Sequence, residues 1–244
     1  MKVKGNTAVI TGSTGQLGSA IALALAKAGC SCICHYHTNQ LLAGELTEQI
    51  QDLGQKAKAV CADLTKPQQI EKLFTETDFS PPRILINSAA VFSKQKLAQV
   101  SFEDSQKVLN TNLIAPILVS QKFAQGIQNR KSSEPAAKII NIVDVGGIRP
   151  WANYTLYCAS KAGLIAATKS LAKELAPDIC VNAVAPGVIT WPEGFPEKAK
   201  PRQIKFVPAG RIGTVDEITS AILFLLKNDY ITGQVLNIDG GRCI

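Results

Sequence analysis

Tyr157 and Lys161 are the two residues of this chain whose types and spacing most directly suggest chemistry. They stand four positions apart, so on a helix their side chains share one face, about a turn from each other. A neighbouring ammonium favours the phenolate form of a tyrosine and lowers its pKa from about 10 toward the range of a useful proton donor. Tyr157 is therefore predicted to be a general acid whose pKa Lys161 lowers, although the same spacing also occurs in ordinary pairs on a helix surface.

Asp144 precedes this pair, at the end of the apolar run that begins at Asn141. An ionised carboxylate cannot donate a hydrogen bond to a carbonyl oxygen, and it would raise the pKa of a tyrosine beside it. The acidic residue suits catalysis if it stays protonated, or if it faces N–H groups of the substrate. Plain ketone reduction is the less natural chemistry for such a site.

A glycine-rich turn near the start of the chain is the expected binding site for a molecule that reacts beside Tyr157, Lys161 and Asp144. The apolar segment 7–10 runs into Gly12, Gly15 and Gly18, and an apolar-periodic helix continues to Ala28. Glycines in a strand-to-helix turn let the backbone approach a diphosphate, and the free amides at the helix start attract its charge. The turn thus predicts a dinucleotide site.

The elements that position these groups alternate along the chain. Its 244 residues are 46% hydrophobic, enough for one domain with a full core. Apolar runs buried on both faces are typical of a parallel sheet. We expect helices at 41–53 and 214–226 and strands at 56–61, 84–87, 138–143 and 234–238, with the stretch 132–135 as a loop inside a single α/β domain spanning 1–244.

Along essentially its whole length the chain resembles the short-chain dehydrogenase/reductase family. The turn and the Tyr157–Lys161 pair are joined, in the expected order, by Asp63-Leu64, Asn87-Ser88-Ala89-Ala90, Asn112, Asn182, Pro186-Gly187 and Asp239-Gly240-Gly241. The resemblance implies a Rossmann-type, doubly wound parallel sheet of about seven strands with helices on both faces. It also implies hydride transfer from a nicotinamide cofactor.

The resemblance assigns roles to particular residues. Lys161 would bind the ribose hydroxyls, and Asn112 would bind a water near Lys161 and complete a proton path. The cofactor would be contacted by Gly12, Gln16, Leu17, Gly18, His37, Thr38, Asn39, Asp63, Leu64, Asn87, Ser88, Ala89, Tyr157, Lys161, Pro186, Gly187 and Thr190.

The residues after Tyr36 indicate which cofactor is preferred. An acidic residue there would accept hydrogen bonds from a ribose 2′-hydroxyl and repel a 2′-phosphate, and none is present. His37, Thr38 and Asn39 can all donate to phosphate oxygens, which predicts NADPH. His35 and His37 could also be metal ligands, but no third ligand accompanies them, so no metal site is expected.

Three departures from the family pattern resemble its pteridine reductase branch: Gln16 replaces the middle glycine of the turn, Asp144 replaces the catalytic serine, and Phe92 stands where that branch stacks an aromatic ring on the pterin. The predicted reaction is NADPH-dependent reduction of a dihydropterin or dihydrofolate to the tetrahydro form, with substrate contacts from Phe92, Asp144, Tyr157 and Trp191. Trp191 could instead anchor a lid, expected at about 188–207, which closes over the substrate.

Two alternatives remain open at this point. One is an NADPH-dependent reductase of 3-oxoacyl thioesters or of other ketones, a common task on this fold. The other is a non-catalytic protein that uses the fold only to bind a cofactor, because fold alone does not fix function.

Composition favours a cytoplasmic protein with a small-molecule substrate. The net charge of +7 is spread along the chain without an aromatic-interleaved basic patch, so no nucleic-acid partner is expected. Neither a signal peptide nor a stretch of about 20 apolar residues is visible, so no membrane partner is expected either. Cys30, Cys32 and Cys34 alternate along a strand, as free cysteines in a core do. The family resemblance implies a homotetramer.

Overall fold

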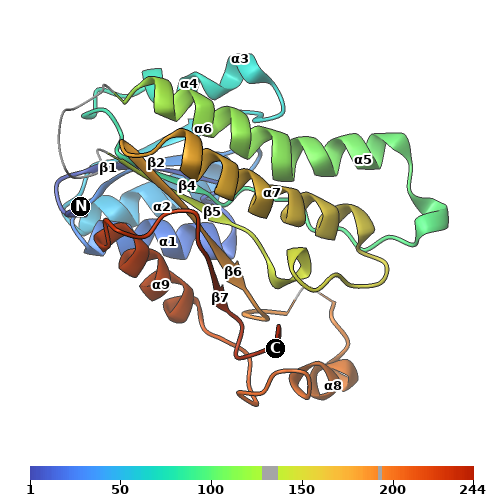
Figure 1. Cartoon of the computed structure of the whole chain (residues 1–244). Coiled ribbons are helices and arrows are strands. Elements are labelled where there is room, and N and C mark those ends of the chain that lie inside the picture. Colours follow the sequence, from blue (N-terminus) through green and yellow to red (C-terminus); the bar gives the residue numbers. More distant parts are fainter. Residues whose placement is uncertain (128–136, 192–193) are drawn as a thin grey trace.

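A seven-stranded, fully parallel sheet forms the centre of the molecule, as Figure 1 shows. In this computed structural model, the described residues are 1–127, 137–191 and 194–244. The strand order is β3-β2-β1-β4-β5-β6-β7, which confirms the predicted doubly wound topology. The strands are β1 (Thr7–Thr11), β2 (Ser31–Tyr36), β3 (Ala57–Cys61), β4 (Ile84–Asn87), β5 (Ala137–Ile142), β6 (Ile179–Pro186) and β7 (Val235–Ile238).

Helices cover both faces of the sheet (Figure 1). One face packs against α1 (Gln16–Lys27), α2 (Gln40–Asp52) and α9 (Val215–Lys227). The other packs against α3 (Pro67–Ile70), α4 (Lys72–Thr75), α6 (Ala115–Gln125) and α7 (Thr155–Glu174), with α5 (Phe102–Leu109) beside α7. Short helical turns complete the described chain: η1 (Leu97–Gln99), η2 (Asn110–Ile114), η3 (Val145–Gly147), η4 (Glu197–Ala199) and α8 (Lys200–Ile204).

Burial on both faces explains the strands' near-continuous apolar sequences. All five residues of β1 and all eight of β6 are buried. Cys30, Cys32 and Cys34 lie in the core that β2 shares with α1, which confirms their structural role. Burial raises the pKa of the Cys30 and Cys34 thiols to about 12, so neither is a thiolate near neutral pH.

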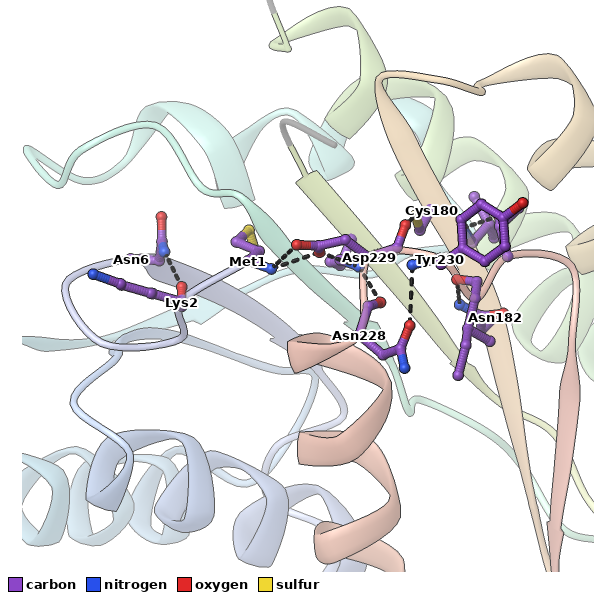
Figure 2. Close-up of polar contacts among 12 residues, drawn as sticks. Met1, Lys2, Asn6, Cys180, Asn182, Asn228, Asp229 and Tyr230 are labelled. Carbon is purple, nitrogen blue, oxygen red and sulfur yellow. Dashed lines mark hydrogen bonds and ion pairs between the residues drawn. The ribbon is translucent and has the colours of Figure 1, made fainter. Parts of the chain in front are cut away.

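The amino ends of the strands are held by an ionic cluster away from the glycine-rich turn. Figure 2 shows the Asp229 side chain beside the amine of Met1. The Met1 nitrogen donates to both carboxylate oxygens, each at 2.5 Å. The fully buried Lys138 of β5 adds an ion pair to Asp229 at 2.7 Å and donates to the Asn228 carbonyl at 2.6 Å. A buried ammonium without such partners would be costly, so the cluster fixes the segment between α9 and β7 against β5.

The carboxyl ends of the strands carry the loops that make the site. β1 lies between β2 and β4, so the connections leaving β1 and β4 diverge to opposite faces and leave a crevice between them. The segment between β6 and α9 lies beyond this edge, and its described residues include the short turns η4 and α8. Of the sequence predictions, the loop at 132–135 and residues 192–193 of the lid lie outside the described residues. Across the described chain, no helix is long and apolar enough to span a membrane.

Candidate active site

The turn after β1 brings backbone segments unusually close together. Gly12 has a φ of +65°, and a Cβ there would lie 2.7 Å from the Cα of Ala89. A Cβ on Gly18 would lie 2.2 Å from the Gly12 carbonyl oxygen. Only glycine fits at both positions. Helix α1 then begins at Gln16 with no side-chain cap, so its first amides are unfilled donors that suit a diphosphate.

His35 holds this turn in place, a role that sequence reasoning missed. Its side chain is buried, and its Nδ1 accepts a hydrogen bond from the amide of Gly12 at 3.0 Å. Its Nε2 lies 3.0 Å from the carbonyl oxygen of Ala62, which can only accept, so Nε2 carries the proton. Burial lowers the pKa of His35 to about 4, in keeping with this neutral form. The signal in the sequence was a histidine on an otherwise apolar buried strand.

A cavity of about 570 Å³ lies beside the turn. Gly12, Leu17, Gly18, His37, Thr38, Asp63, Leu64, Ser88 and Ala89, all predicted to contact the cofactor, line it. The predicted residue Asn39 is not among the residues lining this cavity. Its side chain instead caps α2 by accepting from the Leu42 amide at 3.1 Å.

Asn87 also serves the framework rather than a cavity. Its side-chain nitrogen donates to Asn141 at 2.8 Å and to Ser120 at 3.1 Å, which ties β4 to β5 and α6. The predicted contact of Asn87 with a cofactor stays a prediction, and its side-chain amide points into the core. The loop after β4 is held instead by Thr11, whose hydroxyl accepts from the Ser88 and Ala89 amides at 3.0 and 3.1 Å.

Tyr157 and Asp144 meet at the carboxyl end of β5. The Tyr157 hydroxyl donates to Asp144 Oδ2 at 2.8 Å, and the Gly146 amide donates to Asp144 Oδ1 at 2.7 Å. Burial raises the pKa of Asp144, although the hydrogen bonds from Gly146 and Tyr157 oppose the rise. Burial thus favours the protonated form of this carboxyl group more than water does. A proton on Oδ2 would reverse the bond to Tyr157, with Asp144 donating to the phenol oxygen.

Lys161 does not lower the pKa of Tyr157 in this structure, contrary to the sequence prediction. Burial and the adjacent Asp144 carboxylate raise the pKa of Tyr157 above its usual value. The Lys161 ammonium lies 5.9 Å from the centre of the Tyr157 ring and donates to the Ile142 carbonyl at 2.8 Å, while the hydroxyl faces Asp144. Burial also lowers the pKa of Lys161 to about 8.

Asn112 lies in η2, a π-helical turn just before Pro116, where a distortion of the helix was expected. Its Oδ1 accepts from the Val91 amide at 2.8 Å, and its Nδ2 donates to the Val91 carbonyl at 2.9 Å and to Ser160 at 3.1 Å. Asn112 therefore positions the loop after β4 against α7. The water predicted near Lys161 stays a prediction.

A second cavity, of about 770 Å³, is lined by Asp144 and Tyr157. Phe92, 48% exposed, lines it with its ring centre 4.8 Å from that of Tyr157 in an edge-to-face arrangement. Trp151 and Tyr154, which sequence reasoning missed, complete an aromatic wall. The other predicted residues that reach this cavity are Gln16, Leu17, Ser88, Asp144, Lys161, Pro186, Gly187, Thr190 and Trp191.

Trp191 belongs to the segment after β6, which borders the same cavity. Its ring stacks on that of Phe195, with centres 4.8 Å apart. The pairing gives Trp191 a partner within its own segment, as expected of an anchor, and leaves it in the cavity wall, as expected of a substrate contact.

Comparison with known proteins agrees with this arrangement. The profile of the family described as enoyl-(acyl carrier protein) reductase matches residues 13–242. The chain belongs to the short-chain dehydrogenase/reductase family. A 3-oxoacyl-(acyl-carrier-protein) reductase of Thermotoga maritima is 34% identical, with 100% of each chain covered. A 3beta-hydroxysteroid dehydrogenase of Eggerthella lenta is 32% identical, with 99% of this chain and 95% of the relative covered.

The fold of this short-chain dehydrogenase/reductase also matches solved structures. A blue fluorescent protein from a metagenomic library, described in complex with NADPH, superimposes with a TM-score of 0.90 at 28% identity, over 100% of both chains. The family and its oxidoreductase chemistry are thereby established. The relatives' names span different substrates, so the substrate must be argued from the site.

Proposed function

We propose that this protein is an NADPH-dependent reductase of dihydropterins or dihydrofolate, which it converts to the tetrahydro form. The observation that carries the substrate assignment is the buried Asp144–Tyr157 hydrogen bond beneath the half-exposed ring of Phe92. A flat, polar heterocycle fits between an aromatic wall and a nicotinamide. Asp144 supplies an oxygen that can exchange protons or accept from ring N–H groups.

NADPH suits the first cavity. Gly12 and Gly18 leave room for a diphosphate at the start of α1, where a Cβ would clash with backbone. His37 and Thr38 line the cavity at the end of β2, where no acidic residue directly follows the strand to repel a 2′-phosphate; Asp63, from the loop after β3, also lines the cavity. The structural relative described with NADPH supports the same choice. When bound, the cofactor supplies the hydride.

Side chains of the protein would supply the proton that the reduced substrate needs. Reduction of the C6=N5 bond places the hydride on C6 and requires a proton on N5. Tyr157 donates its hydroxyl proton there and regains one from protonated Asp144 across the 2.8 Å hydrogen bond. Protonating Asp144 removes the charge that raises the pKa of Tyr157, so the two groups act as one donor. Lys161, whose ammonium donates to the Ile142 carbonyl, would bind the ribose hydroxyls of the cofactor.

Reduction of 3-oxoacyl thioesters is the second candidate, and the relatives favour it more than they favour pterin reduction. The family profile and the Thermotoga maritima relative both carry names of acyl-carrier chemistry. A protonated Asp144 could also donate a hydrogen bond to a ketone oxygen, as a serine does. Both candidates thus use a protonated Asp144, and the aromatic ring of Phe92 in the cavity wall is what favours a flat heterocycle over a thioester.

The segment 188–207 would act as the substrate lid in either case. Val188, Trp191 and Gln203 line the second cavity, so movement of this segment would open it or exclude water from it.

Oxidation of NADPH, followed at 340 nm with dihydrobiopterin, dihydrofolate and an acetoacetyl thioester in parallel, tests the assignment. We expect turnover with the pterins, reduced about 100-fold or more in Tyr157→Phe while NADPH affinity is nearly kept. Oxidation with the thioester alone would replace the pterin proposal by the second candidate. No oxidation with any substrate would leave a cofactor-binding protein without this catalysis.

A further inference from the structure

We propose that Arg242 is a specificity-determining residue that binds an anionic tail of the substrate at the lid end of the second cavity. The inference rests on the proposed function only in placing the substrate in this cavity. It applies equally to carboxylates on a pterin side chain and to a phosphate on an acyl carrier, because both present an oxyanion to a guanidinium.

Arg242 is held in the cavity wall by the turn that follows β7. Gly240 and Gly241 have φ values of +62° and +87°, and the Asp239 carboxylate accepts from the amides of Gly241 and Cys243, each at 2.9 Å. This turn brings the chain back toward the carboxyl ends of the strands. The partly buried side chain of Arg242 then lines the cavity that also contains Asp144.

The charge of Arg242 has no carboxylate partner among the described residues. Its guanidinium forms no ion pair with any of them and donates instead to neutral oxygens of Gln203, to the carbonyl at 3.3 Å and to Oε1 at 2.9 Å. A guanidinium carries five N–H donors, so three remain after these two bonds. A partly buried cation with free donors is complementary to an anion.

The charged side chains that line the second cavity are mostly positive, like Arg242. Among the described residues, its lining contains three basic side chains, Lys94, Lys161 and Arg242, against one carboxyl group, Asp144. Arg242 acts on that carboxyl group electrostatically, and opposes the rise in its pKa that burial causes. An uncharged substrate would leave this positive potential without a counter-charge. A substrate with an anionic tail supplies one and is concentrated by it.

A purely structural explanation of Arg242 is that it ties α8 to the carboxyl-terminal turn through Gln203. Gln203→Leu separates the two roles, because it removes the side-chain bond at 2.9 Å and keeps the cation. Arg242→Gln removes the cation and keeps a polar side chain of moderate length. The pair of variants therefore serves as test and matched control.

The test compares a charged and an uncharged substrate of each class with NADPH at saturation. The pterin pair is dihydrofolate and dihydrobiopterin, and the thioester pair is acetoacetyl-coenzyme A and acetoacetyl-N-acetylcysteamine. We expect Arg242→Gln to lower the ratio of kcat/KM, charged over uncharged, by at least tenfold in the class that turns over. Gln203→Leu should change the ratio less than threefold. The class that responds identifies the source of the anion.

An unchanged ratio in Arg242→Gln, or an equal fall in Gln203→Leu, overturns the inference. If no substrate turns over, the proposed function fails and calorimetry with folate and pantetheine 4′-phosphate, in the presence of NADP⁺, decides about Arg242. At least tenfold weaker binding of one of them to Arg242→Gln than to the unmodified protein supports the inference. Equal affinity, or no binding to either protein, overturns it.

Discussion

Replacement of His35 by phenylalanine should weaken both the fold and the cofactor site. The phenyl ring keeps the size and planarity of the imidazole but removes its bonds to the Gly12 amide and the Ala62 carbonyl, each at 3.0 Å. Two buried backbone groups then lack partners, at a cost of about 1–3 kcal/mol each. We expect His35→Phe to lower the free energy of unfolding by roughly 2–6 kcal/mol and Tm by about 4–12 °C.

The pH dependence of stability gives a sharper signature. His35 has a folded-state pKa of about 4, below its unfolded value of about 6.5, so between these values the unfolded chain binds the proton and the folded protein does not. Stability is therefore lost as the pH falls from about 6.5 toward 4, by about 3 kcal/mol for this group. Urea unfolding of His35→Phe should lack this component. His37, which also contributes to the lowered pKa of His35, is controlled by His37→Asn in both backgrounds.

Cofactor affinity separates positioning of the turn from general destabilisation. Ile33→Val, in the same strand, should cost only about 0.5–1.5 kcal/mol and touches no polar group of the turn. We expect the NADPH dissociation constant, measured by fluorescence, to rise at least tenfold in His35→Phe and to stay nearly constant in Ile33→Val. The reasoning fails if both variants bind NADPH equally, or if His35→Phe keeps the full loss of stability between pH 6.5 and 4.

Three further outcomes are expected. Gly18→Ala should weaken NADPH binding by about 100-fold or more, measured by fluorescence, because its Cβ would lie 2.2 Å from the Gly12 carbonyl oxygen. The value of kcat/KM should fall as the pH rises through about 8, where the buried Lys161 loses its proton in the free enzyme. Phe92→Ala should raise the KM for a pterin about tenfold with kcat nearly kept, because a half-exposed ring in the cavity wall is lost.

Each of these has a simple check. Gly44→Ala, in open space on α2, is the control for Gly18→Ala, and equal NADPH binding by both would contradict the packing argument. Lys161→Arg should move the basic limb of the pH profile upward; a limb that stays near pH 8 would belong to another group. A pterin KM unchanged in Phe92→Ala would remove this ring from the substrate site.

The local sequence was enough to determine the elements and their order. The run at β4 is predicted at 84–87 and observed at Ile84–Asn87, because four buried apolar or small polar residues between turn signals leave few alternatives. Gly12 and Gly18 predicted a close approach of the backbone at the turn. Only a residue without a Cβ tolerates the contacts observed there. The Tyr157–Lys161 pair followed from helical spacing taken together with the glycine-rich turn and the order of the other family motifs.

Other parts of the site could not be predicted, because they depend on residues that are far apart in the sequence. His35 bonds to Gly12 and Ala62, which lie 23 and 27 positions away, so no local pattern could reveal its role. Asn87 was expected at a cofactor, yet its side chain turns toward Asn141, 54 positions away. Such pairings exist only once the parallel strands are in register.

Electrostatics depended most on the tertiary structure. Spacing placed Lys161 near Tyr157 but could not show that the ammonium would lie under the ring while the hydroxyl faced Asp144. A pKa responds to burial and to the exact position of charges, neither of which spacing records. The sequence by itself thus determined the family, the fold and the candidate reacting groups, whereas the tertiary structure decided that Tyr157 bonds to Asp144 and that Arg242 lines the same cavity, because both depend on how distant segments pack.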